Sequence, residues 1–195
     1  DVRELGVDML SISSHKFYGP KGAGALFIRK GLKISALIFG GSQERRLRAG
    51  TENVPALVGF GKACELARKE LTDRMSKCER LRQLLLALIQ KKIDGIRVNT
   101  DLKNSVCSTL NIGFRDVASE ALLTRLDMKG ICVSSGSACA GLTKTSHVLK
   151  AMKVPIEFLH SSIRISIGHE NTEDEIRKTV EAIDEIVKQI RKSGF

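Results

Sequence analysis

The stretch His160–Ile176 reads HSSIRISIGHENTEDEI and carries two successive patterns that decide the fold. From Ser161 to Gly168, isoleucine alternates with small or charged polar residues, which is typical of a strand with one apolar face. Thr172 and Glu175 then have the spacing of a capping box, which predicts the start of a helix. One apolar stripe continues this helix toward the C-terminus, through Ile176, Val180, Ile183, Val187 and Ile190. A strand followed by an amphipathic helix indicates a mixed fold.

The rest of the chain alternates in the same way between short apolar runs and helical patterns. Further strands are predicted at Val7–Ser13, Gly24–Lys30, Ile96–Thr100, Cys107–Phe114 and Ile131–Ser135. Further helices are predicted at Val54–Leu71, at about Asp73–Lys92 and at Asp116–Met128, the last of them ending at Gly130 as a C-terminal cap. This order of elements favours an α/β or α+β fold.

The composition changes near Leu71–Arg74. Before this point the chain is rich in glycine and loops, and it includes the polar segment GGSQERRLRAGTEN at Gly40–Asn53, which we interpret as a long functional loop. After it, strands and helices follow one another closely and end in the terminal helix. We therefore predict two parts, residues 1–71 and residues 72–195.

The overall composition is that of a globular protein, with 42% hydrophobic and 28% charged residues in 195. No apolar run has the length of a membrane span, and no signal peptide is visible. The net charge is +10, but Lys and Arg are interleaved with Glu and Asp along helical segments, and there is one Tyr and no Trp. We therefore expect solvated helix faces and do not expect nucleic-acid binding.

Five cysteines stand at positions 64, 78, 107, 132 and 139, and no pair has the C-x-x-C spacing of a zinc or redox motif. The sequence therefore predicts no metal site and no disulfide framework, and it favours a reducing compartment. The first four cysteines lie in helical or strand-like runs and are interpreted as core or half-buried residues. Cys139 differs, because it lies in the small-residue segment SSGSACAG, where a thiol has few packing neighbours and is better placed to react. Taken alone, this segment leaves an incidental cysteine as the alternative.

A second chemical motif is Ser13-Ser14-His15-Lys16, which directly follows the first predicted strand. A lysine held in a tight polar turn can act as a nucleophile or a base. The neighbouring hydroxyls and imidazole could hold a phosphate. Spacing alone leaves an ordinary surface loop as the alternative.

Four blocks together resemble the NifS/IscS-type cysteine desulfurases of the class V aminotransferase family. They read SSHKFYGPKGAGALFIRK, GGSQERRLRAGTENVPALVGFGKA, VSSGSACAG and HSSIRISIGHENTEDEI, and they follow the family's order over nearly the whole chain. The resemblance implies a PLP-dependent transferase fold. Residues 1–71 would be the C-terminal part of the large PLP-binding domain, and residues 72–195 the small α+β domain that carries the catalytic cysteine.

The resemblance also implies which residues hold the cofactor, pyridoxal 5'-phosphate (PLP). Lys16 would be the Schiff-base lysine, and Ser13, Ser14 and His15 would bind PLP from the same block. Thr51, in RAGT, would reach the PLP phosphate of the neighbouring subunit of a homodimer.

Two further residues would act on the substrate, L-cysteine. Arg164 would bind its carboxylate, for which a planar guanidinium is well suited. Cys139 would attack the substrate sulfur, keep it as a persulfide and release alanine. A sulfur-acceptor scaffold or carrier protein would then take the sulfur for iron–sulfur cluster assembly or tRNA thiolation.

The resemblance covers only the C-terminal half of the family's pattern. The His that stacks on the pyridine ring and the Asp that pairs with its nitrogen lie upstream in the family, and this chain begins without Met. We therefore expect this chain to need an N-terminal half and to be inactive alone. Ser14, where glycine is frequent, and Ala140-Gly141, after the nucleophile, are smaller departures.

Two alternatives stay open at this point. A selenocysteine lyase would share the fold and most of the blocks. An inactive piece that only binds a partner would follow from the missing upstream residues. For the desulfurase we expect a cytoplasmic location, or an organelle matrix in a eukaryote, and no membrane partner.

Overall fold

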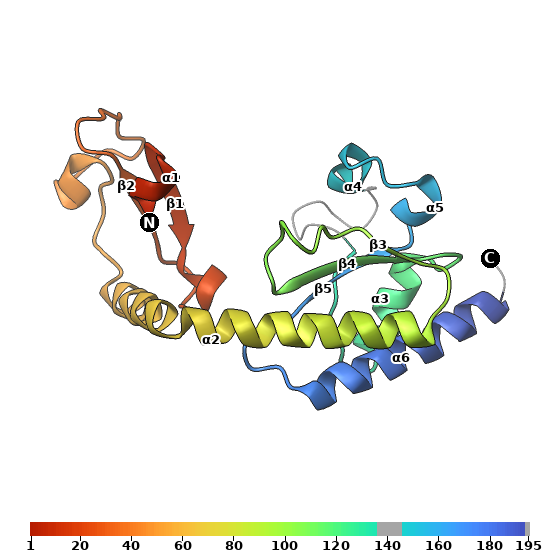
Figure 1. The fold of residues 1–195 in the computed structure, drawn as a ribbon. Coiled ribbons are helices and arrows are strands. Elements are labelled where there is room, and N and C mark those ends of the chain that lie inside the picture. The colour runs from red at the N-terminus through yellow and green to blue at the C-terminus, as the bar shows by residue number, and fades with distance from the viewer. Residues whose placement is uncertain (136–145, 194–195) are drawn as a thin grey trace. The chain divides into compact units, whose positions relative to one another are not determined.

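A computed structural model describes residues 1–135 and 146–193 (Figure 1). The chain divides into two compact units, Asp1–Leu71 and Thr72–Phe195. The long helix α2 (Val54–Lys92) contributes residues to both units. The assignment of these units to a large PLP-binding domain and a small domain stays a prediction.

The first unit is built around a two-stranded antiparallel sheet. Its strands are β1 (Met9–Ser13) and β2 (Gly24–Ile28), and their register places Ser13 opposite Gly24. Both strands lie within the runs that the sequence predicted. The remaining elements are α1 (Val2–Leu5), the 3-10 turns η1 (Ser14–Phe17) and η2 (Gln43–Arg46), and the beginning of α2. The sheet therefore ends directly at the turn that carries Lys16.

Helix α2 differs from its prediction, because Val54–Lys92 forms one helix of 39 residues instead of two. The change of composition near Leu71 suggested a break, but no proline or glycine lies between Thr72 and Lys92 to end the helix there. A change of composition is therefore compatible with an uninterrupted helical backbone.

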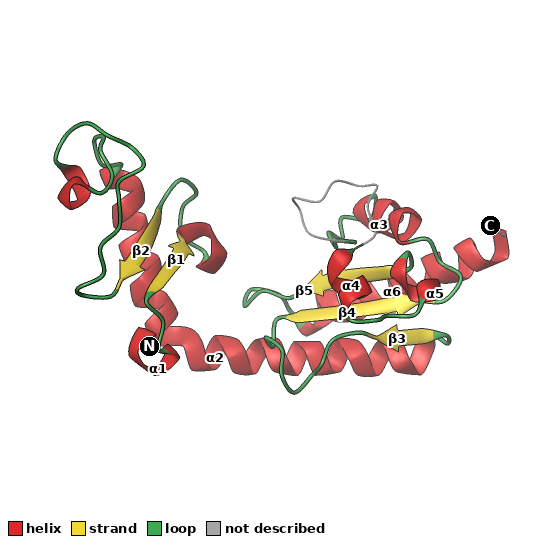
Figure 2. Cartoon of the chain, turned by 90° about the horizontal axis from the view of Figure 1, so that it is seen from above, coloured by secondary structure: helices red, strands yellow, loops and turns green. Residues whose placement is uncertain are grey.

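The second unit consists of a three-stranded antiparallel sheet with helices on both faces (Figures 1 and 2). Its strands lie in the order β3 (Ile96–Val98), β4 (Thr109–Phe114) and β5 (Ser162–Ser166). One face packs against α2, α3 (Ser119–Asp127) and α6 (Glu173–Ser193), and these elements share the main hydrophobic core. The short helices α4 (His147–Ala151) and α5 (Ile156–Leu159) lie on the other face.

The alternation predicted for β5 is confirmed. Ile163, Ile165 and Ile167 are buried in the core, whereas Arg164 and Ser166 are exposed. The stripe of α6 is also confirmed, since its five predicted members are buried. These side chains together supply much of the apolar area whose burial stabilises the unit.

Two predictions near α3 and β5 need correction, and three short helices were not predicted. Ile131–Ser135 forms no regular strand and contributes only an isolated bridge between Ser134 and Arg164. Helix α3 starts later than predicted, because Asp116 adopts a left-handed backbone conformation with φ 59° that a helix cannot include. The sequence patterns also missed the short helices α1, α4 and α5, which are too brief to show a period.

The C-terminal cap of α3 predicted at Gly130 is confirmed by its backbone conformation and hydrogen bonds. Gly130 has φ 75°, and its N–H donates to the Asp127 carbonyl at 2.8 Å. The next N–H, of Ile131, reaches back to the Leu126 carbonyl at 2.9 Å. This is the pattern of a glycine-terminated helix, in which a left-handed residue satisfies the last carbonyls.

The cysteines were only partly predicted. The interpretation as core or half-buried residues is confirmed for Cys78, which is buried, and Cys107, which is half-buried, but it is wrong for Cys64 and Cys132, which are exposed. All four are free thiols. Burial raises the pKa of the Cys78 thiol, whose Sγ lies 3.6 Å from the Ile167 carbonyl oxygen.

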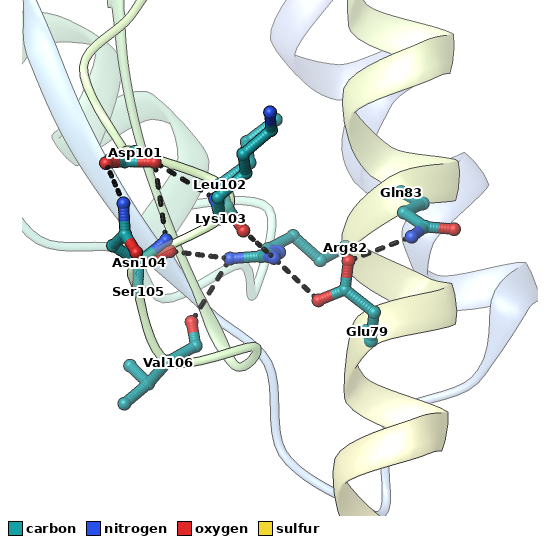
Figure 3. Close-up of polar contacts among 9 residues, drawn as sticks. All are labelled: Glu79, Arg82, Gln83, Asp101, Leu102, Lys103, Asn104, Ser105 and Val106. Atoms are coloured by element: carbon teal, nitrogen blue, oxygen red, sulfur yellow. Dashed lines mark hydrogen bonds and ion pairs between the residues drawn. The ribbon is translucent and has the colours of Figure 1, made fainter.

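Arg82 is the most deeply buried charged residue among those described, with 2% of its surface exposed. Its guanidinium donates to Ser105 Oγ at 2.9 Å and to the carbonyls of Val106 and Leu102, each at 3.2 Å (Figure 3). An ion pair with Glu79 on the same helix, at 2.6 Å, offsets its charge. Arg82 therefore fastens the loop between β3 and β4 to helix α2.

The same loop is also closed on itself. The Asp101 carboxylate accepts bonds from the backbone N–H groups of Lys103 and Asn104 and from the Asn104 side chain (Figure 3). The Asn104 side-chain bond is the main reason why the pKa of Asp101 is lowered. Both sets of contacts fix the approach of the chain to β4.

The capping box predicted for α6 is present. Thr172 N–H donates to the Glu175 carboxylate at 2.9 Å, and Glu175 N–H donates to Thr172 Oγ1 at 3.2 Å. The first bond is the main cause of the lowered Glu175 pKa. The bond to the Glu175 carboxylate therefore contributes its full stabilisation above the ordinary pKa of a glutamate. This contribution is lost as the pH falls through the lowered pKa of Glu175.

Replacement Thr172→Val is expected to lower the free energy of unfolding by about 1 kcal/mol, because it removes the Oγ1 acceptor and keeps the shape. Urea unfolding followed by far-ultraviolet circular dichroism measures this loss. It should persist at acid pH, since the Thr172 hydroxyl does not titrate there. Thr179→Val, the same change inside α6, is the control, and equal losses in the two variants would contradict the cap.

No helix within residues 1–135 or 146–193 has both the length and the apolar character that crossing a bilayer requires.

Candidate functional site

The turn that follows β1 carries the predicted cofactor residues of the first unit. Ser13 ends the strand, and His15 and Lys16 lie in η1; all three side chains are exposed. The turn begins with a backbone bond from Ser14 N–H to the Ala23 carbonyl at 3.0 Å, which ties it to the start of β2. A hydroxyl, an imidazole and an amine are thus presented together from one short, fixed segment.

Ser14 has a different place from its neighbours. Its side chain is fully buried, and its Oγ is without a hydrogen-bond partner in the described part of the chain. A Cβ added at Gly19 would lie 2.0 Å from this Oγ and 3.1 Å from Ala63 Cβ, so a glycine is required for the turn to close. The Ser14 side chain therefore packs inside the turn, and its predicted contact with PLP stays a prediction.

Thr51 is exposed and lines a cleft of about 750 Å³ in the first unit, together with Gly24, Leu26, Ile38 and Arg48. No hydrogen bond or ion pair joins Thr51 to the Ser13–Lys16 turn within the residues that the structure describes. The structure thus brings four predicted cofactor residues together in one turn and places Thr51 separately, on the loop before α2.

In the second unit, Arg164 projects from the sheet face opposite the main core. It is exposed, and its guanidinium has no hydrogen bond or ion pair with any other described residue. Its backbone forms two bonds with Ser134, from Ser134 N–H to Arg164 O at 3.0 Å and from Arg164 N–H to Ser134 O at 2.5 Å. Arg164 is therefore available to an anionic ligand on a fixed backbone.

Cys139 lies outside the described residues. The segment that leads to it starts at Ser134, which is the residue bonded to Arg164.

Sequence reasoning missed a polar network on the same face as Arg164. It joins Asn99, Asn111 and Ser162, which come from three separate segments of the second unit. Ser162 was predicted on this face, but the two asparagines gave no signal because neither belongs to a motif.

Comparison with known proteins identifies the family. The model of the aminotransferase class-V family matches residues 1–179. This chain belongs to the class V aminotransferases. Curated relatives include the cysteine desulfurase IscS of Dictyoglomus turgidum, 45% identical over 98% of this chain and 49% of the relative. A cysteine desulfurase of Nostoc is 46% identical over 98% of the chain and 48% of the relative.

Solved structures of the class V type agree. A NifS-like protein has a TM-score of 0.87 and 39% identity over 97% of this chain and 48% of that chain. A NifS-like protein from Rickettsia africae has a TM-score of 0.87 and 34% identity, over 96% of this chain and 49% of that chain. The predicted fold of the class V type is therefore confirmed. The chain spans about half the length of the relatives it matches.

The class V aminotransferases are PLP-dependent, and the residues present fit this cofactor. Lys16 would supply an exposed amine for the aldehyde, and Ser13 and His15 would supply donors for a phosphate from the same short segment. The tight closure of the turn at Gly19 holds these donors in one arrangement.

Proposed function

We propose that the complete protein is a PLP-dependent cysteine desulfurase, which converts L-cysteine to L-alanine and transfers the sulfur to Cys139. The observation that carries this proposal is the exposed Arg164, bonded through its backbone to the residue from which the Cys139 segment starts. The names of relatives about 45% identical over nearly the whole chain support it. Because the chain spans about half of these relatives, we expect the 195 residues alone to be inactive.

The first unit would hold the cofactor and move a proton. When bound, PLP supplies an electron sink for an amino acid attached to it. Lys16 Nζ would hold PLP covalently at rest and would take up and return a proton at the substrate Cα. Ser13 and His15 would donate to the phosphate, and Ser14 would support the turn from inside. Thr51 would reach the phosphate of the neighbouring subunit in a homodimer.

The second unit would bind the substrate and accept its sulfur. Arg164 would bind the α-carboxylate of L-cysteine through two parallel N–H donors. The Cys139 thiolate would attack the substrate sulfur, so that a sulfur–sulfur bond forms as the carbon–sulfur bond breaks. The electron pair of the broken bond would pass to the substrate carbon, which takes up a proton, so that alanine leaves and Cys139 keeps the sulfur as a persulfide.

We propose a protein acceptor for this sulfur, either a scaffold for iron–sulfur cluster assembly or a carrier for tRNA thiolation. The free thiols of Cys64, Cys78, Cys107 and Cys132 are compatible with a reducing compartment such as the cytoplasm or an organelle matrix. A comparison of turnover with L-cysteine and L-selenocysteine would separate the desulfurase from a selenocysteine lyase.

Covalent attachment of PLP to Lys16 tests the cofactor part of this proposal. The complete protein is incubated with PLP and reduced with borohydride, and its peptides are examined by mass spectrometry. We expect a pyridoxyl group on Lys16 and its loss, together with the visible PLP absorbance, in Lys16→Ala. The control is Lys21→Ala, which removes an exposed lysine five residues away and should leave the adduct unchanged. An adduct that persists in Lys16→Ala would contradict the assignment.

A further inference from the structure

Four neighbouring chain segments of the second unit form a polar row across the sheet. Arg164 on β5 is paired on one side with Ser134 and on the other with Asn111 on β4. Asn111 is bonded in turn to Asn99, just after β3. Residues paired across adjacent strands project to the same face of a sheet. The Asn111 side chain therefore lies on the face that presents the Arg164 guanidinium.

The backbone bonds show how near these two side chains are. The N–H and carbonyl of Arg164 both bond to Ser134. The N–H of Asn111 donates to Thr100 Oγ1 at 2.7 Å, and its carbonyl accepts from Asn99 N–H at 2.9 Å. Asn111 and Arg164 are consequently a non-hydrogen-bonded pair, the kind in which Cα atoms approach to about 4.5 Å and side chains are closest.

A chain of donors and acceptors fixes the orientation of the Asn111 amide. It starts at the Phe158 carbonyl on α5, which can only accept and receives the Ser162 hydroxyl proton at 2.6 Å. Having donated its proton, Ser162 Oγ accepts from Asn99 Nδ2 at 2.9 Å. Asn99 Nδ2 also donates to Asn111 Oδ1 at 2.7 Å. Asn111 therefore presents its oxygen to Asn99, and its Nδ2 points away from it.

Two unsatisfied groups show that this network is not built for stability alone. Asn99 is 8% exposed, and its Oδ1 is buried without a partner within the described residues. An unpaired buried acceptor costs about 1–3 kcal/mol. The Nδ2 group of half-buried Asn111 also has no hydrogen-bond partner in the described part of the chain. The network keeps a free amide donor beside an arginine that has no ion pair.

We propose that Asn111 is a second ligand-binding residue of this face, whose side-chain N–H donates to the carboxylate that Arg164 binds. The inference rests on the proposed function, because it takes the ligand to be the carboxylate of an amino acid. Arg164 supplies the charge, and Asn111 supplies a directed neutral donor without competing for that charge. Asn99 is a positioning residue, since it acts only by holding the Asn111 oxygen.

A titration followed by NMR tests this proposal in the 195-residue chain without activity or cofactor. The probe is L-alanine, and L-alaninamide, which lacks the carboxylate, is the reference compound. We expect the Arg164 Nε–H and Asn111 Nδ2–H signals, assigned with Arg164→Gln and Asn111→Asp, to shift together with one Kd, and only with L-alanine.

The variant Asn111→Asp keeps an oxygen for Asn99 but replaces the free donor by a negative charge. We expect it to weaken L-alanine binding about tenfold or more, because a hydrogen bond to a charged group is lost and repulsion is added. Gln90→Glu, the same amide-to-acid change at an exposed position of α2, should bind as the unmodified chain does.

The outcomes separate this inference from the proposed function. If the Arg164 signal shifts while the Asn111 amide signal stays in place, or if Asn111→Asp binds normally, the role of Asn111 is wrong and that of Arg164 stands. If neither signal responds to L-alanine, both the carboxylate site and the part of the proposed function that depends on it are overturned. If Asn111→Asp does not fold, the response of the Asn111 Nδ2–H signal in the unmodified chain still tests the role of Asn111.

Discussion

Replacement Arg82→Ala is expected to lower the free energy of unfolding of the second unit by about 3 kcal/mol, because it removes a buried charged donor and leaves its acceptors unpaired. Two carbonyls and the Ser105 hydroxyl lose their donor, and Glu79 loses its partner. Urea unfolding measures the loss. Amide hydrogen exchange should show earlier opening at residues 101–106, because Arg82 is what fastens this loop to α2.

Arg80→Ala is the matched control, two residues away on the same helix. Arg80 also pairs with a glutamate, Glu173, but both side chains are largely exposed. Such a pair contributes at most about 1 kcal/mol. A further variant, Arg82→Met, restores the apolar stem without the donors, so it should remain close to Arg82→Ala if hydrogen bonds dominate. Equal losses of unfolding free energy in Arg80→Ala and Arg82→Ala would show that the burial of Arg82 adds nothing to its contribution to stability.

The features predicted well from the sequence are those whose signal is local. The alternation of β5 needs only eight residues, and the capping box of α6 needs four; both are confirmed in the structure. The glycine that ends α3 is local as well. Because each pattern contains its own physical reason, no knowledge of the rest of the fold was needed.

The features that the sequence missed depend on segments that meet only in the fold. Arg82 was not singled out, because a charged residue in a helix usually lies on a solvated face, and its acceptors come about twenty residues later. The exposure of Cys64 and Cys132 likewise depends on what packs nearby. Asn99, Asn111 and Ser162 form a network only once three segments are brought together. Cys139 was identified through its block, and it lies outside the described residues.

Replacement Cys139→Ala in the complete protein is expected to reduce sulfur release from L-cysteine by at least about 10²-fold, the scale of loss when a covalent nucleophile is removed. The thiol is the only group in the proposed reaction that can accept the sulfur atom, so its loss leaves the carbon–sulfur bond without an attacking partner. Sulfide and alanine are measured under reducing conditions. The visible absorbance of PLP should stay unchanged, because in the proposed function the cofactor is held by Lys16 and not by Cys139.

Cys132→Ala is the closest control, since it removes an exposed free thiol seven residues before Cys139, directly ahead of the sequence block that contains Cys139. If any accessible thiol could accept the sulfur, Cys132 and Cys64 would also accept it, and no single replacement would reduce the rate strongly. We expect both of these replacements to leave the rate within about twofold, because exposure alone does not place a thiol at the substrate sulfur. Mass spectrometry of the unmodified protein after one turnover should find the added sulfur on Cys139. Sulfur found on Cys132, or normal turnover in Cys139→Ala, would transfer the nucleophile's role to another residue.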